Sequence, residues 1–204
     1  MQIGFFLDSD ACIGCKACAM ACRDCHDSPS GVGYRKVYQL AWGTWQEENG
    51  MAVPWGVSSY SISFACHHCE QPACQAACPK KAIQKDQAGR VWIQEAFCVS
   101  CRICIKKCPN GAISFNAKSN RPEKCDLCRE RLERGKLPVC VEACPMRCLE
   151  VLSLDELLWR ERNMPDVYRF PDAMGTGPAF FIKANRRQEQ QLENGILCSL
   201  SEEL

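Results

Sequence analysis

The stretch CIGCKACAMACRDC, residues 12–25, places five cysteines within fourteen residues. These cysteines can be grouped in two ways. In the first grouping, C-x2-C-x2-C-x3-C, the members are Cys12, Cys15, Cys18 and Cys22. In the second, C-x3-C-x2-C, they are Cys18, Cys22 and Cys25. The two groupings predict different chemistry, so the rest of the sequence must decide between them.

The first spacing is that of the iron-sulfur ligand run of bacterial ferredoxins, in which the fourth cysteine binds the other cluster of a two-cluster protein. The second spacing is that of enzymes that cleave S-adenosylmethionine at a cluster with one open iron. The first grouping therefore predicts an electron carrier, and the second predicts a radical enzyme.

The composition indicates metal sites. The 204 residues include 19 cysteines, about 9% of the total, which is typical of disulfide scaffolds or metal sites. Disulfide scaffolds are usually secreted, but the N-terminus MQIGFFLDSD has neither the features of an export signal nor a twin arginine. The odd cysteine count also argues against complete pairing. We therefore expect metal binding.

Other function classes are disfavoured by simple observations. No stretch approaches the roughly 18 to 20 apolar residues of a membrane span, so we expect no direct span. The sequence has 25 Lys plus Arg against 24 Asp plus Glu, so it lacks the excess positive charge that would attract nucleic acid. It lacks the G-x-G-x-x-G pattern and a phosphate loop, so no nucleotide or flavin site is expected.

The cysteines form an internal repeat of four groups. Three groups share an ending, CPKKAIQ, CPNGAIS and CPMRCLE, in which a proline turns the backbone and a short apolar run follows. We predict short strands at residues 3–7, 59–64, 82–85, 91–94, 112–116 and 148–152, and short helices between the third and fourth cysteines of a group. The four groups are Cys12, Cys15, Cys18, Cys22; Cys66, Cys69, Cys74, Cys78; Cys98, Cys101, Cys104, Cys108; and Cys125, Cys128, Cys140, Cys144.

The fold class predicted is α+β, with two ferredoxin-like modules, an inserted loop region and an irregular C-terminal tail. The insertion is residues 26–58, which contain three tryptophans and no cysteine. LDELLWRERN has helical spacing. The expected divisions are 1–58, the first group plus the insertion; 59–118, a central module with groups two and three; 119–153, the fourth group, which pairs with the first; and 154–204, a helix and tail.

All-cysteine ligation fits iron-sulfur chemistry, because soft thiolates suit these clusters. Group four alone would also fit zinc. Cross-ligation predicts that the groups work in pairs, either one with four and two with three, or as neighbours along the sequence. The first pairing gives these ligand sets: Cys66, Cys69, Cys74 with Cys108; Cys98, Cys101, Cys104 with Cys78; Cys12, Cys15, Cys18 with Cys144; and Cys125, Cys128, Cys140 with Cys22. Spacing leaves both pairings open.

Several stretches of the sequence resemble a known family. IGFFLDSDACIGCKAC, GTWQEENG, HHCEQPACQAACPKKA, CRICIKKCPNGA and KCDLCRERLERGKLPVCVEACP are similar to the four-cluster iron-sulfur subunit of molybdopterin oxidoreductases, above all that of anaerobic dimethyl sulfoxide reductase. The resemblance covers most of residues 1–183. It implies the pairing of groups one with four and two with three. Because some relatives hold a 3Fe-4S cluster where a tryptophan replaces the position of Cys104, it also implies four 4Fe-4S clusters here.

The resemblance further implies a non-catalytic subunit that relays electrons between a quinol-oxidising membrane anchor and a molybdopterin catalytic subunit. The partner's substrate is expected to be dimethyl sulfoxide or an N-oxide, in anaerobic respiration; sulfur oxyanions, selenate or formate remain alternatives. The expected location is peripheral, on the cytoplasmic membrane through a partner. The periplasmic face is expected if a twin-arginine catalytic subunit carries this protein across.

Two alternatives of other classes remain. A radical S-adenosylmethionine activase would need a barrel for which 204 residues leave no room, and a zinc-binding interaction module would make no use of the ferredoxin runs. Cys25 and Cys198 are then spare thiols, and Cys148, which aligns with alanine elsewhere in the repeat, is expected to fill a small buried site. His67 and His68 are expected to pack or form hydrogen bonds rather than bind metal, and His26 to be a loop residue.

Overall fold

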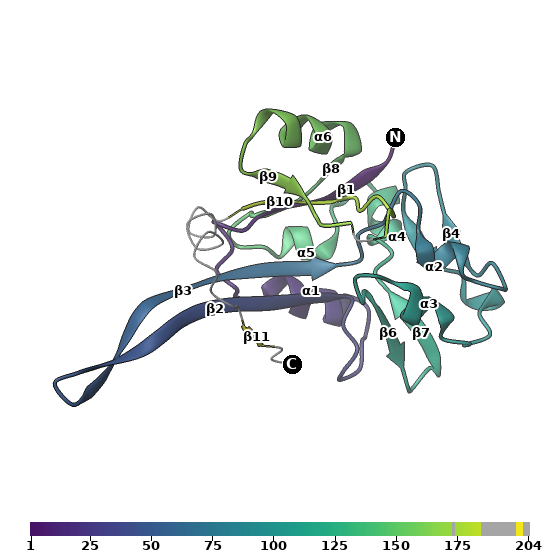
Figure 1. The fold of residues 1–204 in the computed structure, drawn as a ribbon. Coiled ribbons are helices and arrows are strands. Elements are labelled where there is room, and N and C mark those ends of the chain that lie inside the picture. The colour runs from purple at the N-terminus through teal and green to yellow at the C-terminus, as the bar shows by residue number, and fades with distance from the viewer. Residues whose placement is uncertain (173, 185–198, 202–204) are drawn as a thin grey trace.

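The computed structural model describes residues 1–172, 174–184 and 199–201. A four-stranded sheet carries a helix on its outer face, a long hairpin extends away from it, and two short hairpins lie at the opposite end (Figure 1). Among the residues described, none of the helices has the length and apolar character needed to cross a bilayer.

The four-stranded sheet joins segments from opposite ends of the sequence. Its order is β8-β1-β10-β9, with β1 (Ile3–Asp8) antiparallel to β8 (Leu149–Ser153) and parallel to β10 (Phe180–Lys183). β9 (Val167–Arg169) completes the edge. The prediction of an irregular tail is therefore wrong for this segment, because the apolar run at β10 is buried beside β1.

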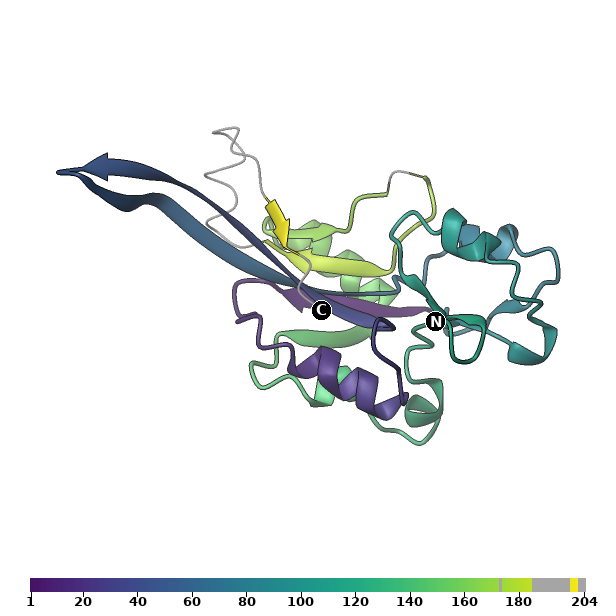
Figure 2. The ribbon, with the colours of Figure 1, turned by 90° about the horizontal axis from the view of Figure 1, so that it is seen from below.

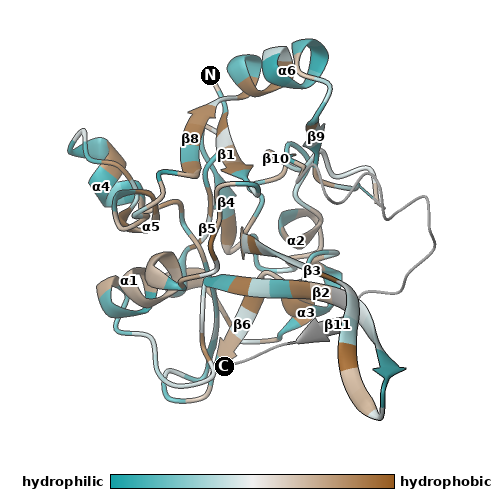
Figure 3. Ribbon diagram, turned by 90° about the vertical axis from the view of Figure 1, so that its left-hand side faces the viewer, coloured by the Kyte–Doolittle hydropathy of each residue, from teal (hydrophilic) through white to brown (hydrophobic). Residues whose placement is uncertain are grey.

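Helix α6 (Leu154–Asn163) covers this sheet, and its position agrees with the predicted helix. Ser153 caps its N-terminus by accepting a hydrogen bond from the backbone N–H of Glu156 at 3.1 Å. Leu157, which is fully buried, packs against Phe6 and Phe181. The helix is otherwise largely hydrophilic, whereas β8 is largely apolar (Figure 3).

A long hairpin replaces the inserted loop region that the sequence predicted. β2 (Arg35–Glu48) pairs with β3 (Met51–Ala65) along almost their whole length, so the loop prediction is wrong for this part of residues 26–58. Asn49 and Gly50 form the turn with φ values of 52° and 75°, which is the preference of a two-residue hairpin. β11 (Ser199–Ser201) adds to β2 as a third strand.

The central cysteine groups lie beside two short hairpins. β4 (Ile83–Lys85) pairs with β5 (Val91–Ile93), and β6 (Ile113–Asn116) pairs with β7 (Arg121–Lys124), close to the predicted strands. A shared core of Cys74, Ile83, Val91, Cys104 and Ile113 joins the two hairpins. The short helices here are α2 (Ala73–Ala76), the 3-10 turn η1 (Glu95–Phe97) and α3 (Ile103–Lys107).

Groups one and four lie together under the large sheet, although more than one hundred residues separate them. Helix α1 (Ala17–Cys25) packs against α5 (Val139–Glu142), and the strands that flank them, β1 and β8, pair with each other (Figure 2). α4 (Arg129–Glu133) lies in the same part of the molecule. Four of these helices, α1, α2, α3 and α5, each include the third cysteine of a group, so they begin earlier than the sequence predicts.

Candidate iron-sulfur centres

The ligand loops repeat one backbone conformation. The residue before the second cysteine of every group has a positive φ: Gly14 68°, His68 44°, Ser100 55° and Leu127 64°. A left-handed backbone is uncommon for non-glycine residues and is concentrated at functional sites. The loops are therefore held in a conformation that local propensity alone does not favour.

The same repetition occurs after the last cysteine of three groups. Lys81, Gly111 and Arg147, each three residues beyond that cysteine, have φ values of 49°, 58° and 53°. In groups two and three the next residue donates its backbone N–H to the cysteine sulfur: Ala82 to Cys78 Sγ at 3.3 Å, and Ala112 to Cys108 Sγ at 3.4 Å. These donors are placed to stabilise a negatively charged sulfur.

Three cavities of similar size are lined by cysteines, and each has a volume of about 20 Å³. In each case three cysteines of one group meet the last cysteine of another. The linings contain Cys98, Cys101, Cys104 and Cys78; Cys66, Cys69, Cys74 and Cys108; and Cys12, Cys15, Cys18 and Cys144.

The remaining predicted ligands also lie near one another. Cys22 interacts electrostatically with Cys140 and Cys128, and Cys125 interacts with Cys22 and Cys140. Burial raises the pKa of Cys22 to about 12 and that of Cys128 to about 11. These thiols are therefore protonated at neutral pH without metal, and binding iron as thiolates must release their protons.

Two cations are buried among these cysteines. Arg35 is 2% exposed, and its Nη1 donates to the Ser63 backbone carbonyl and to Ser63 Oγ. Lys124 is 5% exposed, and its Nζ donates to the backbone carbonyls of Val91 and Cys125. An isolated buried cation is costly, so negative charge nearby is needed to compensate it. Thiolate-bound clusters, at about −2 each, would supply that charge, and the residues present therefore fit such groups.

Cys148 is buried, as expected, but it does more than fill space. Its Sγ lies 3.4 Å from Cys144 Sγ, and its side chain also forms a hydrogen bond with that of Cys12. The hydrogen bond with Cys148 lowers the pKa of Cys12 to about 6. Cys25 is exposed at the end of α1, and Cys198 lies outside the described residues. None of the cysteines in the described part of the sequence forms a disulfide.

The histidines have distinct surroundings. His68 Nδ1 accepts the backbone N–H of Val91 at 2.9 Å, and His67 stacks on Phe180 with ring centroids 5.0 Å apart. Burial lowers the pKa of His67 to about 3, which keeps its ring neutral. Both histidines therefore pack or form hydrogen bonds here.

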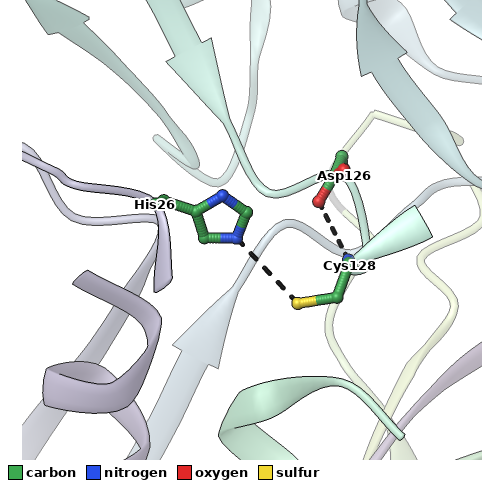
Figure 4. A group of neighbouring side chains, drawn as sticks. All are labelled: His26, Asp126 and Cys128. Carbon is green, nitrogen blue, oxygen red and sulfur yellow. Dashed lines mark hydrogen bonds between the residues drawn. The ribbon is translucent and has the colours of Figure 1, made fainter. Parts of the chain in front are cut away.

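His26 lies in the turn after α1 and points toward the sulfur of Cys128, with Nε2 3.9 Å from Sγ (Figure 4). Asp126 accepts the backbone N–H of Cys128 at 2.9 Å. These three side chains could contact one metal ion. Zinc prefers a fourth ligand and a closed tetrahedral site, and Cys128 belongs to the predicted iron-binding group, so His26 is better placed to donate a hydrogen bond to that sulfur.

Comparison with known proteins agrees with this geometry. Residues 5–23 match the model of a 4Fe-4S binding domain, and residues 57–154 match that of a 4Fe-4S dicluster domain. The iron-sulfur subunit of anaerobic dimethyl sulfoxide reductase from Escherichia coli (strain K12) is 42% identical over 186 residues, which cover 90% of this protein and 89% of the relative. The protein belongs to the family of anaerobic dimethyl sulfoxide reductase iron-sulfur subunits.

Other relatives support this family assignment. The anaerobic dimethyl sulfoxide reductase iron-sulfur subunit of Haemophilus influenzae is 35% identical over 185 residues, covering 91% of this protein and 90% of the relative. Protein NrfC of Escherichia coli (strain K12) is 34% identical over 187 residues, covering 89% and 80% respectively. As a family member with ferredoxin-type 4Fe-4S domains, this dimethyl sulfoxide reductase-type subunit is an iron-sulfur protein.

Sequence reasoning missed Arg35 and the contacts of Cys148 in this dimethyl sulfoxide reductase-type subunit. Arg35 begins a strand and carries no motif, so no signal in a single sequence distinguishes it from a surface arginine. Cys148 aligns with Ala82 and Ala112, which favours a passive role. That same departure from the repeat is the signal that could have revealed its contacts, because a thiol four residues beyond a ligand is within reach of the metal site.

Proposed function

We propose that this protein is an electron-transfer subunit that holds four 4Fe-4S clusters and connects a quinol-oxidising membrane anchor with a molybdopterin catalytic subunit. The observation that carries this proposal is the set of three cavities, each lined by three cysteines of one group and the last cysteine of another; Cys148 also lines one of them. The relatives that are named for anaerobic dimethyl sulfoxide reductase support the class of partner.

The ligand assignment follows the predicted pairing of groups. The three cavities supply three sets of four cysteines, and the mutual proximity of the remaining four supports the last set. The proposed sets are Cys12, Cys15, Cys18, Cys144; Cys22, Cys125, Cys128, Cys140; Cys66, Cys69, Cys74, Cys108; and Cys78, Cys98, Cys101, Cys104.

This assignment divides the protein into two ferredoxin-like modules. Residues 59–118 form one module, and residues 119–153 combine with the first group, within residues 1–58, to form the other. The pairing of β1 with β8 supports the second module, because it holds the first and fourth groups side by side. Within residues 154–204, we assign α6 to covering the large sheet and β10 to completing it.

The clusters supply one-electron transfer when they are bound. The protein's own residues have three tasks: cysteine thiolates bind iron, backbone N–H groups donate to sulfur, and buried apolar side chains exclude water. We assign no catalytic residue to this subunit. The substrate would be reduced in the partner, with dimethyl sulfoxide or an N-oxide proposed and sulfur oxyanions, selenate or formate as alternatives.

We place the subunit peripherally on the cytoplasmic membrane, held there by its partners. The periplasmic face is proposed for the case in which a twin-arginine catalytic subunit carries this protein across. Protease accessibility in intact spheroplasts tests the side. Cleavage from outside supports the periplasmic face, and protection until lysis contradicts it.

Metal analysis tests the cofactor assignment. Anaerobically purified protein is expected to contain about 16 iron and 16 sulfide per molecule, with several reducible paramagnetic signals. Stoichiometric zinc in place of iron would contradict the proposal and favour the site of His26, Asp126 and Cys128. Cleavage of S-adenosylmethionine by the isolated protein would contradict it as well.

Isolation of the complex tests the partners. An affinity tag on this subunit is expected to retain a molybdenum-containing subunit and a membrane subunit, and the complex should oxidise a quinol with dimethyl sulfoxide as acceptor. Retention of a molybdenum subunit that is active only on another acceptor would contradict the substrate assignment. Absence of molybdenum from every retained protein would contradict the role itself.

A further inference from the structure

Arg35 is fully enclosed at the start of β2, yet its guanidinium makes no ion pair with any carboxylate of the described residues. One face of the guanidinium lies over the ring of Phe5, with Cζ 4.4 Å from the ring centroid. Enclosing a cation in this way is costly unless opposite charge and hydrogen-bond acceptors surround it.

Only one of the three guanidinium nitrogens of Arg35 forms hydrogen bonds with the described residues. Nη1 donates to Ser63 Oγ at 3.0 Å and to the Ser63 carbonyl at 3.3 Å. Nε and Nη2 have no acceptor among the described residues, although both are buried. Buried donors are almost always paired, so these two nitrogens face an acceptor that the described residues do not provide.

The surroundings of Arg35 indicate what that acceptor is. Ser63 Oγ lies 3.2 Å from Cys18 Sγ, which links the guanidinium to a proposed ligand through one hydroxyl. Cys140 and Cys125, followed by Cys18 and Cys22, lie close enough to Arg35 to interact electrostatically with its guanidinium. These cysteines belong to two proposed ligand sets, and Arg35 lies within the field of both.

We propose that Arg35 is the internal counter-charge of the module formed by groups one and four, donating Nε–H and Nη2–H to sulfur atoms of its clusters. This inference rests on the proposed function, because it requires clusters in those two sites. Reduction adds one negative charge to a cluster that already carries about −2. A fixed cation and its hydrogen bonds stabilise the reduced form, so Arg35 raises the midpoint potentials of both clusters. It is a positioning and tuning residue that takes no part in ligation.

The test compares three variants in the complete complex. Arg35→Met removes the charge and the donors, Arg35→Lys keeps the charge, and Arg134→Met removes a charge from an exposed side chain in the same loop as group four. Each protein is titrated with reductant under anaerobic conditions, and its clusters are followed by paramagnetic resonance. Iron content is measured on the same samples.

We expect Arg35→Met to move two midpoint potentials downward and to leave the other signals in place. Arg35→Lys should restore most of the shift, and Arg134→Met should produce none. Unchanged potentials in Arg35→Met with full iron content would overturn the proposal, as would an equal shift in Arg134→Met. Loss of clusters in both Arg35 variants would show a purely structural role and also overturn it. Absence of clusters from the unmodified complex would instead refute the proposed function, so the two failures are distinguishable.

Discussion

Replacing Cys144 by alanine should leave its cluster with a fourth ligand, because Cys148 can take over. The Sγ atoms of the two residues lie 3.4 Å apart, so the sulfur of Cys148 needs to move no farther than this to occupy the vacated position. A change between two staggered χ1 rotamers moves a cysteine sulfur by roughly 3 Å. The thiol proton would pass to solvent as the new iron-sulfur bond forms.

Cys108→Ala is the matched control, because the residue four positions farther on is Ala112, which cannot bind iron. With only three thiolates left, that cluster is expected to lose one iron or to be lost entirely. The iron content would then fall from about 16 to about 15 or 12 per molecule. Cys144→Ala should stay at about 16.

The assay combines anaerobic iron analysis with paramagnetic resonance of the oxidised protein, in which a three-iron cluster is visible and an intact 4Fe-4S cluster is silent. Cys148→Ala alone should keep all its iron, whereas the double variant Cys144→Ala, Cys148→Ala should behave like Cys108→Ala. If Cys144→Ala already loses iron as Cys108→Ala does, or if the double variant retains it, substitution by Cys148 is refuted.

The remaining predictions concern the fold around the sites. Leu157→Ala should lower the free energy of unfolding by about 2–5 kcal/mol because the side chain is fully buried; urea unfolding measures this, with the exposed Trp159→Ala as control. Gly14→Ala should reduce the iron content by about one cluster, because its φ of 68° disfavours a side chain and a Cβ there would meet the Ser61 side chain. Replacing residues 44–55 with a two-residue turn should leave the iron content unchanged, because the far end of the hairpin lies away from the cysteine cavities (Figure 1); loss of iron would contradict this.

The local part of the fold could be predicted because it is encoded over short distances. A cysteine group and the proline that follows it span about a dozen residues, and the strands after Cys78 and Cys108 lie within one residue of their predicted starts. The hairpin turn at Asn49 and Gly50 is equally local, and the Asn-Gly pair is the signal that could have revealed it.

The large sheet was harder to predict from the sequence, because it joins segments at opposite ends of the sequence. β10 pairs with β1 although about 175 residues separate them in the sequence, and Lys183 Nζ donates a hydrogen bond to Asp8 Oδ2 at 2.9 Å. A four-residue apolar run such as FFIK indicates a buried strand but says nothing of its partner. The same limit applies to Arg35, whose importance depends on what surrounds it rather than on its neighbours in the sequence.

The choice between the two pairings of cysteine groups shows how the long-range contacts complete what spacing leaves open. Pairing by neighbours along the sequence would require the last cysteine of group two, Cys78, to lie with group one. Instead Cys78 lines a cavity with Cys98 and Cys101 of group three. The antiparallel partner of β1 is β8, which directly follows group four, so this pairing brings group four beside group one and leaves groups two and three to each other. Sheet pairing between the two ends of the sequence is therefore the physical cause that favours one ligand assignment, and disrupting it should affect the clusters of groups one and four before those of the central module.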